Sequence, residues 1–384
     1  MSIQEEIDVQ VRLMDDKGKS YANPKAWNDP VSKGDIFVVT HADAANNNIH
    51  AEGDYFIAQF DGVCGSNYYP AWGSDNSKWR HAWSALSDFR LLFETGSSSG
   101  SIYGNSLNQI GVRAYYTPID ENGIAVPLSA EVLRRTTLTL LDYTNDGPLP
   151  GGWSVSTVQN GFHSLPESQQ FRALERFSSY TQQINTYYIS CGTDEPRRSL
   201  TIGSKITLPG GGVVFNSQSS FHNPVFLRAL TPIFYVSANT NLDREDTAST
   251  SDWDQDNYYF TIKESGYYVF RADITRGVAG PQNWSIISRN KRPSWHYIWQ
   301  LGAAGTAQIS PLNVNIRYNQ RSNAVCLTRL YGKNYNSGYD NWYYQTRFVI
   351  YDQYGNNGLF SAVRNEADWG NTILVIEGDH TSKG

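Results

Sequence analysis

The stretch Thr136–Ser156, TTLTLLDYTNDGPLPGGWSVS, is the feature that most constrains what this chain can fold into. It reads as a strand, a turn that opens at Asp142, and a return strand entered through Gly151 and Gly152. Aliphatic and β-branched side chains favour strands, whereas Asp, Asn, Gly and Pro favour turns. We therefore predict a β-hairpin here. Similar turns follow predicted strands at Asp15, Asp120 and Asp352, but their irregular spacing argues against a repeat array.

The composition extends this strand-and-turn pattern to the whole chain. Aromatic residues make up 14% of the 384 residues, and tyrosine (25) outnumbers phenylalanine (16) and tryptophan (11). Tyrosine and tryptophan suit half-buried strands and binding surfaces, because they join a large apolar ring to a polar group. The 32 glycines supply many turns. We predict an all-β protein of two or three antiparallel β-sandwich, immunoglobulin-like modules with few short helices.

A chain of 384 residues is long for one hydrophobic core, so several domains are expected. We predict an N-terminal β-sandwich-like domain (1–128), a central immunoglobulin-like sandwich (129–238) and a C-terminal aromatic-rich β-sandwich (239–384). The central segment carries about seven predicted strands, as an immunoglobulin sandwich does. The other local predictions are a short helix running into a strand over Lys78–Phe93, a flexible loop over Gly96–Ser101, a short helix within Ser164–Phe177, a tight hairpin over Ile206–Phe215 and an acidic loop over Asn239–Asn257.

One segment resembles a known family. From Asp142 to Val155 the chain runs from the end of a strand through Gly-Pro-Leu-Pro-Gly to a second strand. This sequence pattern resembles the first hairpin of bacterial immunoglobulin-like adhesin modules, and the resemblance covers only this hairpin. It implies a spacer or binding module rather than an enzyme.

The motifs that would indicate catalysis are absent or lack their structural context. Gly96–Gly100 matches G-x-S-x-G formally, but a nucleophile elbow needs a strand before the serine and a helix after it. Gly210–Gly212 lacks the Lys-Ser/Thr of a phosphate-binding loop. The seven histidines show no metal-ligand spacing. We therefore predict that the protein is not an enzyme.

Net charge, cysteine content and hydropathy limit which binding partners and which cellular compartment this chain fits. A net charge of -6 without clustered Lys and Arg argues against nucleic-acid binding. Cys64, Cys191 and Cys326 are far apart and odd in number, so we predict buried thiols rather than disulfides. No stretch reaches the ~20 apolar residues of a transmembrane helix, and no signal peptide is recognisable. We expect cytoplasmic synthesis, followed by release or delivery outside the cell.

Three aspartates at alternate positions form a candidate calcium site. Asp252, Asp254 and Asp256 could supply hard oxygen ligands from one short loop. The EF-hand glycine is missing, since Asn257 stands in its place. The alternative is a solvated acidic turn, and no other cofactor is predicted.

The aromatic loop Tyr331–Tyr344, YGKNYNSGYDNWYY, is the leading candidate for ligand binding. Rigid rings with short polar side chains between them are the mixture that antibody paratopes use, and sugar rings also fit such a surface. The predicted ligand-binding residues are Asn334, Tyr335, Asn336, Tyr339, Asp340 and Trp342. The alternative is that these rings belong to the core.

Two further segments are weaker candidates for ligand binding. One is Asn67–Trp72 with Trp79, which is also rich in aromatic residues. The other is the basic cluster Arg289, Lys291 and Arg292, which is either an anion or acidic-glycan contact or a solvated turn.

These observations favour a non-enzymatic recognition protein of adhesin, lectin or toxin-accessory type, which binds a cell-surface glycan or receptor. A structural self-assembling protein, such as a capsid, spike or inclusion component that forms a homo-oligomer, is the first alternative. A β-rich pore-forming toxin is the second, although Ser178–Tyr188 fits a membrane hairpin poorly.

Overall fold

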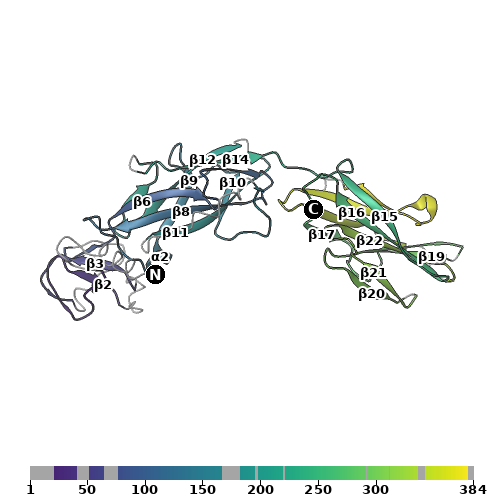
Figure 1. Ribbon diagram of the computed structural model, residues 1–384, viewed down its shortest axis with the longest axis horizontal. Helices are drawn as coiled ribbons and strands as arrows, with labels where there is room; N and C mark the ends of the chain where they lie inside the picture. The colour runs from purple at the N-terminus through teal and green to yellow at the C-terminus, as the bar shows by residue number, and fades with distance from the viewer. Residues whose placement is uncertain are drawn as a thin grey trace. The chain divides into compact units, whose positions relative to one another are not determined.

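The computed structural model describes residues 21–40, 52–64, 77–166, 182–194, 198–218, 221–290, 292–310, 312–335 and 342–378. The chain divides into two compact units, Met1–Leu230 and Thr231–Gly384. Strands dominate both units (Figure 1), and among the described residues the helical elements are α2 (Ala130–Arg135) and the 3-10 turn η4 (Glu366–Asp368). The all-β prediction is confirmed. No helix among the described residues is long and apolar enough to cross a membrane.

Unit 1 is built around two β-sheets that share one core. The first has the order β10 (Trp153–Ser156), β11 (Gln183–Cys191), β8 (Ile110–Ile119) and β6 (Ala85–Phe93). The second has the order β13 (Val213–Phe215), β12 (Ser199–Thr207), β14 (Val225–Leu230) and β7 (Ser99–Tyr103), and β9 (Thr137–Asp142) also pairs with β12. Apolar side chains from both sheets, including Phe89, Val112, Leu140 and Leu227, are buried in one cluster.

A smaller part of unit 1 lies toward the N-terminus of the described chain. It contains the sheet β2 (Ile36–Val38), β3 (Tyr55–Ala58) and β5 (Trp79–His81), and the two-stranded ribbon of β1 (Pro30–Val31) and β4 (Gly62–Val63). Part of this sheet forms a separate cluster, in which Phe37 and Phe56 both pack against Trp79, whereas Ile36 and Ile57 belong to the main core of unit 1.

The predicted hairpin at Thr136–Ser156 is wrong in its pairing. Its two strands form as β9 and β10, but β9 pairs with β12 and β10 pairs with β11, in different sheets. The turn at Asp142 is present, since the Asp142 N–H donates to the Gly147 carbonyl (2.9 Å). The segment therefore crosses from one layer to the other. Alternating side chains predict that a strand forms, whereas the partner depends on which distant strands bury the same face.

Other local predictions had mixed outcomes. Lys78–Phe93 forms the strands β5 and β6 instead of a helix, because Phe89, Leu91 and Phe93 alternate into the core. The predicted loop Gly96–Ser101 already contains the start of β7, which pairs parallel with β14. The hairpin at Ile206–Phe215 is confirmed by the pairing of β12 with β13. Residues 167–177 of the predicted helix lie outside the described residues.

The predicted boundary between residues 128 and 129 does not coincide with a structural boundary. β8 precedes it and pairs with β11, and β7 precedes it and pairs with β14. Both sheets of unit 1 are thus assembled from strands on either side of residue 128. The predicted boundary after residue 238 lies close to the observed division after Leu230.

Unit 2 has three layers, with a six-stranded antiparallel sheet in the middle. The order of this sheet is β15 (Thr240–Ser249), β16 (Trp253–Ile262), β22 (Val325–Gly332), β19 (Arg292–Ile298), β18 (Ser285–Arg289) and β23 (Trp342–Tyr343). A four-stranded sheet forms the second layer, in the order β17 (Arg271–Arg276), β24 (Thr346–Tyr351), β25 (Asn357–Arg364) and β26 (Ile373–Glu377). The ribbon β20 (Gly305–Ile309) and β21 (Val314–Tyr318) belongs to the third.

Two hydrophobic clusters hold these layers together. On one face of the central sheet, Phe260 packs against Phe348 and Phe360 of the four-stranded sheet, with ring centroids 5.6 and 4.6 Å apart. On the other face, Trp299 stacks on Tyr318 of the ribbon at 4.1 Å. Strands such as β22 are therefore apolar on both faces. The predicted acidic loop Asn239–Asn257 is wrong, because it forms most of the paired strands β15 and β16.

One turn occurs in both units with the same hydrogen bonds. In Asp120 and in Asp352, Oδ1 accepts from the main-chain N–H groups two and four residues ahead, at 2.8–2.9 Å. In both turns Oδ2 accepts from a tyrosine hydroxyl, Tyr21 at 3.0 Å and Tyr235 at 2.8 Å. The fourth turn residue is a glycine with φ of +81° or +82°, a conformation that glycine adopts without strain. We call this arrangement the tyrosine–aspartate lock.

The cysteine prediction is confirmed. Cys64, Cys191 and Cys326 are all buried, and none of them forms a disulfide. Burial raises the pKa of Cys64 and of Cys326 to about 11, which keeps both groups protonated and unreactive at neutral pH.

Candidate functional site

Three consecutive aromatic residues are exposed at the end of the central sheet of unit 2. Trp342, Tyr343 and Tyr344 are 41, 42 and 45% exposed. Trp342 and Tyr343 form β23, the terminal strand of the sheet, which pairs with β18. The Tyr344 N–H continues the pairing by donating to the Trp284 carbonyl at 2.9 Å. We call these three residues the aromatic edge.

Arginine side chains lie over two of these rings. The Arg364 guanidinium is 4.9 Å from the centre of the Tyr343 ring, and that of Arg276 is 5.3 Å from the centre of the Tyr344 ring. Such contacts are attractive because the ring face is electron-rich. Burial raises the pKa of Tyr343, and the positive charge of Arg364 opposes this shift.

Arg364 is held in place by the backbone of the edge itself. Its Nη1 donates to the carbonyls of Ile286 and Trp342, both at 3.1 Å, and its Nε donates to Glu366 at 2.7 Å. The guanidinium is thus fixed before any ligand arrives, and with it the orientation of the Tyr343 ring. A preorganised surface of this kind loses little conformational entropy on binding.

The predicted ligand-binding residues differ in their exposure and their contacts. Trp342 is exposed on the aromatic edge. Tyr335 is half-buried and packs edge-on against Trp295, which is fully buried (5.6 Å). Asn334 is exposed, but its Nδ2 donates to Asp252 at 3.1 Å. Asn336, Tyr339 and Asp340 lie outside the described residues.

Four residues of this surface were not among the single residues predicted to bind the ligand, although Tyr343 and Tyr344 lie within the predicted aromatic loop. Tyr343 and Tyr344 directly follow Trp342, and a run of three aromatic residues cannot point entirely into the core when successive side chains alternate. That signal was available in the sequence. Arg276 and Arg364 come from distant strands and carried no comparable signal.

Two of the three aspartates predicted to bind calcium are engaged by arginines, whereas Asp252 accepts from Asn334. Arg329 Nη1 donates to Asp254 Oδ2 (2.8 Å) and Asp256 Oδ2 (2.6 Å), and Arg244 also donates to Asp256 (2.9 Å). Burial raises the pKa of Asp254, but the hydrogen bond from Arg329 contributes to a net downward shift. In the described ranges, no three His, Cys, Asp or Glu side chains are placed to hold a metal ion. The structure does not assemble Asp252, Asp254 and Asp256 as a ligand set.

The weaker candidate segments are not assembled into a site either. Asn67–Trp72 lies outside the described residues, and Trp79 is 1% exposed in the small core of unit 1. Arg289 and Arg292 face each other at the exposed tip of the β18–β19 hairpin, and Lys291 between them is not described.

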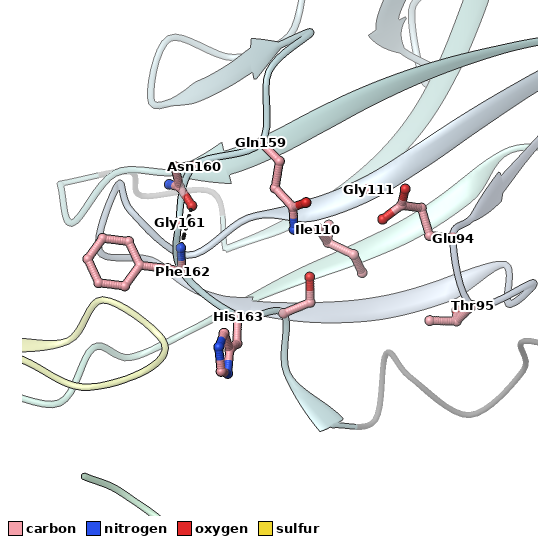
Figure 2. A pocket seen from close by; sticks show the side chains of 10 residues that line it. Glu94, Thr95, Ile110, Gly111, Gln159, Asn160, Gly161, Phe162 and His163 are labelled. Atoms are coloured by element: carbon pink, nitrogen blue, oxygen red, sulfur yellow. Dashed lines mark hydrogen bonds between the residues drawn. The ribbon is translucent and has the colours of Figure 1, made fainter. Parts of the chain in front are cut away.

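Unit 1 contains a polar pocket of about 500 Å³ that the sequence did not indicate. Glu94, Gln159 and His163 are among its lining residues (Figure 2). The loop that carries Gln159 and His163 is anchored by Asn160, whose N–H donates to Gln109 Oε1 at 2.7 Å. Glu94 is 3.8 Å from Arg113, so its charge is partly compensated. The pocket could admit a small hydrophilic molecule, but no further group selects one chemical class.

No protein-family model matches the chain, and no curated protein matches it. Solved structures give only remote similarities. A chain from the complex of Dpr2 Ig1-Ig2 with DIP-Theta Ig1-Ig3 is 7% identical with a TM-score of 0.21, over 70% of this chain and 96% of that chain. The C-terminal domain of the Streptococcus pyogenes antigen I/II-family protein AspA is 7% identical with a TM-score of 0.22, over 77% and 100%.

The collagen adhesin CNA from S. aureus is 9% identical with a TM-score of 0.17, over 77% of this chain and 92% of that chain. TM-scores this low carry no argument about function.

Proposed function

We propose that this chain is a non-enzymatic recognition protein of the adhesin or lectin type, which binds carbohydrate on a cell surface through the aromatic edge. The observation that carries the proposal is the exposure of Trp342, Tyr343 and Tyr344 together on one terminal strand. Large rings exposed side by side on a soluble protein commonly mark an interaction site.

The chemistry of the aromatic edge suits a sugar. A ring face packs against the C–H groups of a pyranose, and the tyrosine hydroxyls can exchange hydrogen bonds with its hydroxyl groups. Arg364 holds Tyr343 from one side, so the ring presents a fixed surface. A ligand on a cell surface requires that the protein act outside the cell in which it is made, and this is part of the proposal.

A glycan array and a cell-binding assay with the full chain test this function. We expect the affinity to fall at least tenfold in Trp342→Ala and in Tyr343→Ala. A ring that stacks on one aromatic side chain typically contributes on the order of 1–3 kcal/mol, and tenfold corresponds to about 1.4 kcal/mol. Phe226→Ala is the matched control, because Phe226 is 46% exposed and lies in unit 1. The absence of binding to any glycan or cell would refute the proposal.

A second function, self-assembly into a homo-oligomer, is favoured by a different observation. β26 is the terminal strand of the four-stranded sheet, and it exposes Leu374 (43%) and Ile376 (45%). An exposed apolar edge strand is a template for pairing with another chain. We expect sedimentation velocity to show concentration-dependent oligomers that Ile376→Lys dissociates. A monomer at all concentrations would contradict this second function.

The pore-forming alternative has no comparable support. Residues 183–188 of the segment Ser178–Tyr188 belong to β11, which pairs on both sides, with β10 and with β8. Releasing it as a membrane hairpin would break a central strand of the unit 1 sheet.

A further inference from the structure

Two arginines stand directly opposite each other on the four-stranded sheet, beside the aromatic edge. Arg276 of β17 pairs with Arg347 of β24. Directly opposite residues on antiparallel strands share a face, with Cβ atoms about 5 Å apart, and like charges in this position destabilise a sheet. The pair therefore costs stability unless an anion compensates it.

The described residues supply no such anion. In the described part of the chain neither arginine forms an ion pair, and the Nε atom of Arg347 is buried without an acceptor. The acidic neighbour on β17, Asp273, already accepts two hydrogen bonds from Arg271, at 2.9 and 2.7 Å. Two guanidinium groups thus keep unused donors on one surface.

The backbone holds this pair next to the aromatic edge. A β-bulge between Ile274 and Arg276 sets the pairing, and Thr346 Oγ1 donates to the Arg276 carbonyl at 2.7 Å. Gly277 has a φ of +108°, and a Cβ added to it would overlap Thr346 Oγ1. Only glycine allows this approach. The Arg276 guanidinium then lies over Tyr344, which joins the arginine pair to the aromatic edge.

We propose that Arg276 and Arg347 bind the acidic group, a carboxylate or a sulfate, of a sugar that lies on the aromatic edge. The ligand class is therefore a charged carbohydrate. This inference rests on the proposed function, since the aromatic edge must hold the sugar ring. Arginine donors in a planar fork match the oxygens of a carboxylate or a sulfate, and the bound anion relieves the repulsion between the two cations.

The test compares neutral glycans with their acidic counterparts on the full chain. The array carries lactose, 3′-sialyllactose and 3′-sulfolactose, with uronic-acid oligosaccharides beside them. We expect the acidic members to bind about tenfold or more tightly than the neutral ones, and the difference to shrink as salt rises from 50 to 500 mM. The sialylated and sulfated arms separate the carboxylate from the sulfate as the preferred group.

Three variants assign the effect to its residues. Arg276→Gln and Arg347→Gln should each remove the preference for acidic glycans, and Arg347→Gln should leave the binding of neutral glycans in place. Tyr343→Ala should weaken both classes. Arg228→Gln, which removes an exposed arginine of unit 1, is the charge-matched control and should change neither. Circular dichroism confirms that each variant is folded.

The outcomes separate this inference from the proposed function. Equal binding of neutral and acidic glycans, or an acidic preference that survives both arginine variants, overturns the arginine site and leaves carbohydrate binding intact. If no glycan binds, the proposed function fails and the arginine site fails with it.

Discussion

At the scale of single residues, Arg329 explains why Asp254 and Asp256 stabilise the fold instead of holding a metal ion. Its side chain is 2% exposed, and it forms ion pairs with Asp254 and Asp256. Its Nη2 also donates to Asn371 Oδ1, in the segment after η4, at 2.6 Å. Removing one partner from a buried ion pair typically costs about 3–5 kcal/mol, because the remaining charge stays buried. The aspartates therefore compensate a charge of the chain itself.

His296 is the titratable residue with the clearest consequence for stability. It is buried in the central sheet, and its Nε2 donates to the Gly370 carbonyl at 2.9 Å. Burial lowers the pKa of His296 to about 4; the hydrogen bond to Gly370 opposes this shift, whereas Arg329 and Arg364 reinforce it. The folded protein therefore disfavours the protonated imidazole.

We predict that unit 2 loses stability as the pH falls below the ordinary histidine pKa of 6.5. The unfolded chain takes up the proton and the folded one resists it down to about pH 4, so the free energy of unfolding falls by up to about 3 kcal/mol. Urea unfolding at pH 7.5 and pH 4.5 measures the change. His296→Gln should show a smaller pH dependence, and an unchanged slope in this variant would contradict the assignment.

The tyrosine–aspartate lock is the feature that matters at the scale of elements. Each lock ties a turn between strands to a tyrosine about a hundred residues earlier in the same unit, at sequence separations of 99 and 117. Both aspartates are buried, at 2% and 0% exposure. The turn residues favour this turn locally, and the hydrogen bond from the tyrosine fixes the turn to the rest of its unit.

We predict that Tyr21→Phe destabilises unit 1 and that Tyr235→Phe destabilises unit 2. Each change leaves a buried carboxylate without its hydroxyl donor, which costs about 1–3 kcal/mol. Differential scanning calorimetry should resolve which transition moves. Tyr354→Phe, at a half-buried position of the same turn, provides a comparison, because Tyr354 donates to Asp352 through its main-chain N–H, which the substitution keeps. Equal shifts in all three variants would argue against the lock.

At the scale of the whole molecule, the two units have separate cores. The clusters around Phe89 and around Phe37 belong to unit 1, and those around Phe260 and Trp299 belong to unit 2. The aromatic edge and the arginine pair lie entirely within unit 2. Folding and binding of unit 2 are therefore expected to be independent of unit 1.

We predict that the fragment Thr231–Gly384 folds alone and keeps the carbohydrate affinity of the full chain within about threefold, since the same surface is present. Cooperative urea unfolding and dispersed amide NMR signals would show the fold, and the glycan array would show the binding. The fragment Met1–Leu230 serves as the control and should not bind. Loss of cooperative unfolding in the C-terminal fragment would contradict independent cores.

Strand and turn chemistry was readable from the sequence because it is local. Alternation of apolar residues, turns at Asp120, Asp142 and Asp352, and the count of aromatic residues led to the all-β class. The wide spacing and odd number of the cysteines led to the buried thiols. Local signals failed where two patterns competed: Lys78–Phe93 has apolar residues at both helical and alternating positions, and the alternation prevailed because it buries Phe89, Leu91 and Phe93 in a sheet.

Only the tertiary structure decided which strands and which side chains pair with each other. The strands of Thr136–Ser156 were predicted, but each joined a different sheet, because burial of an apolar face selects a partner wherever it lies in the chain. Long-range packing also determined the partners of charged side chains and the exposure of aromatic side chains. Asp254 and Asp256 became ion-pair partners once β22 brought Arg329 beside them, and the aromatic residues divided into the buried Trp295 and the exposed Trp342 according to their place in the sheet. Sequence determines which residues can form strands and turns, whereas long-range packing determines which side chains remain on the surface to bind.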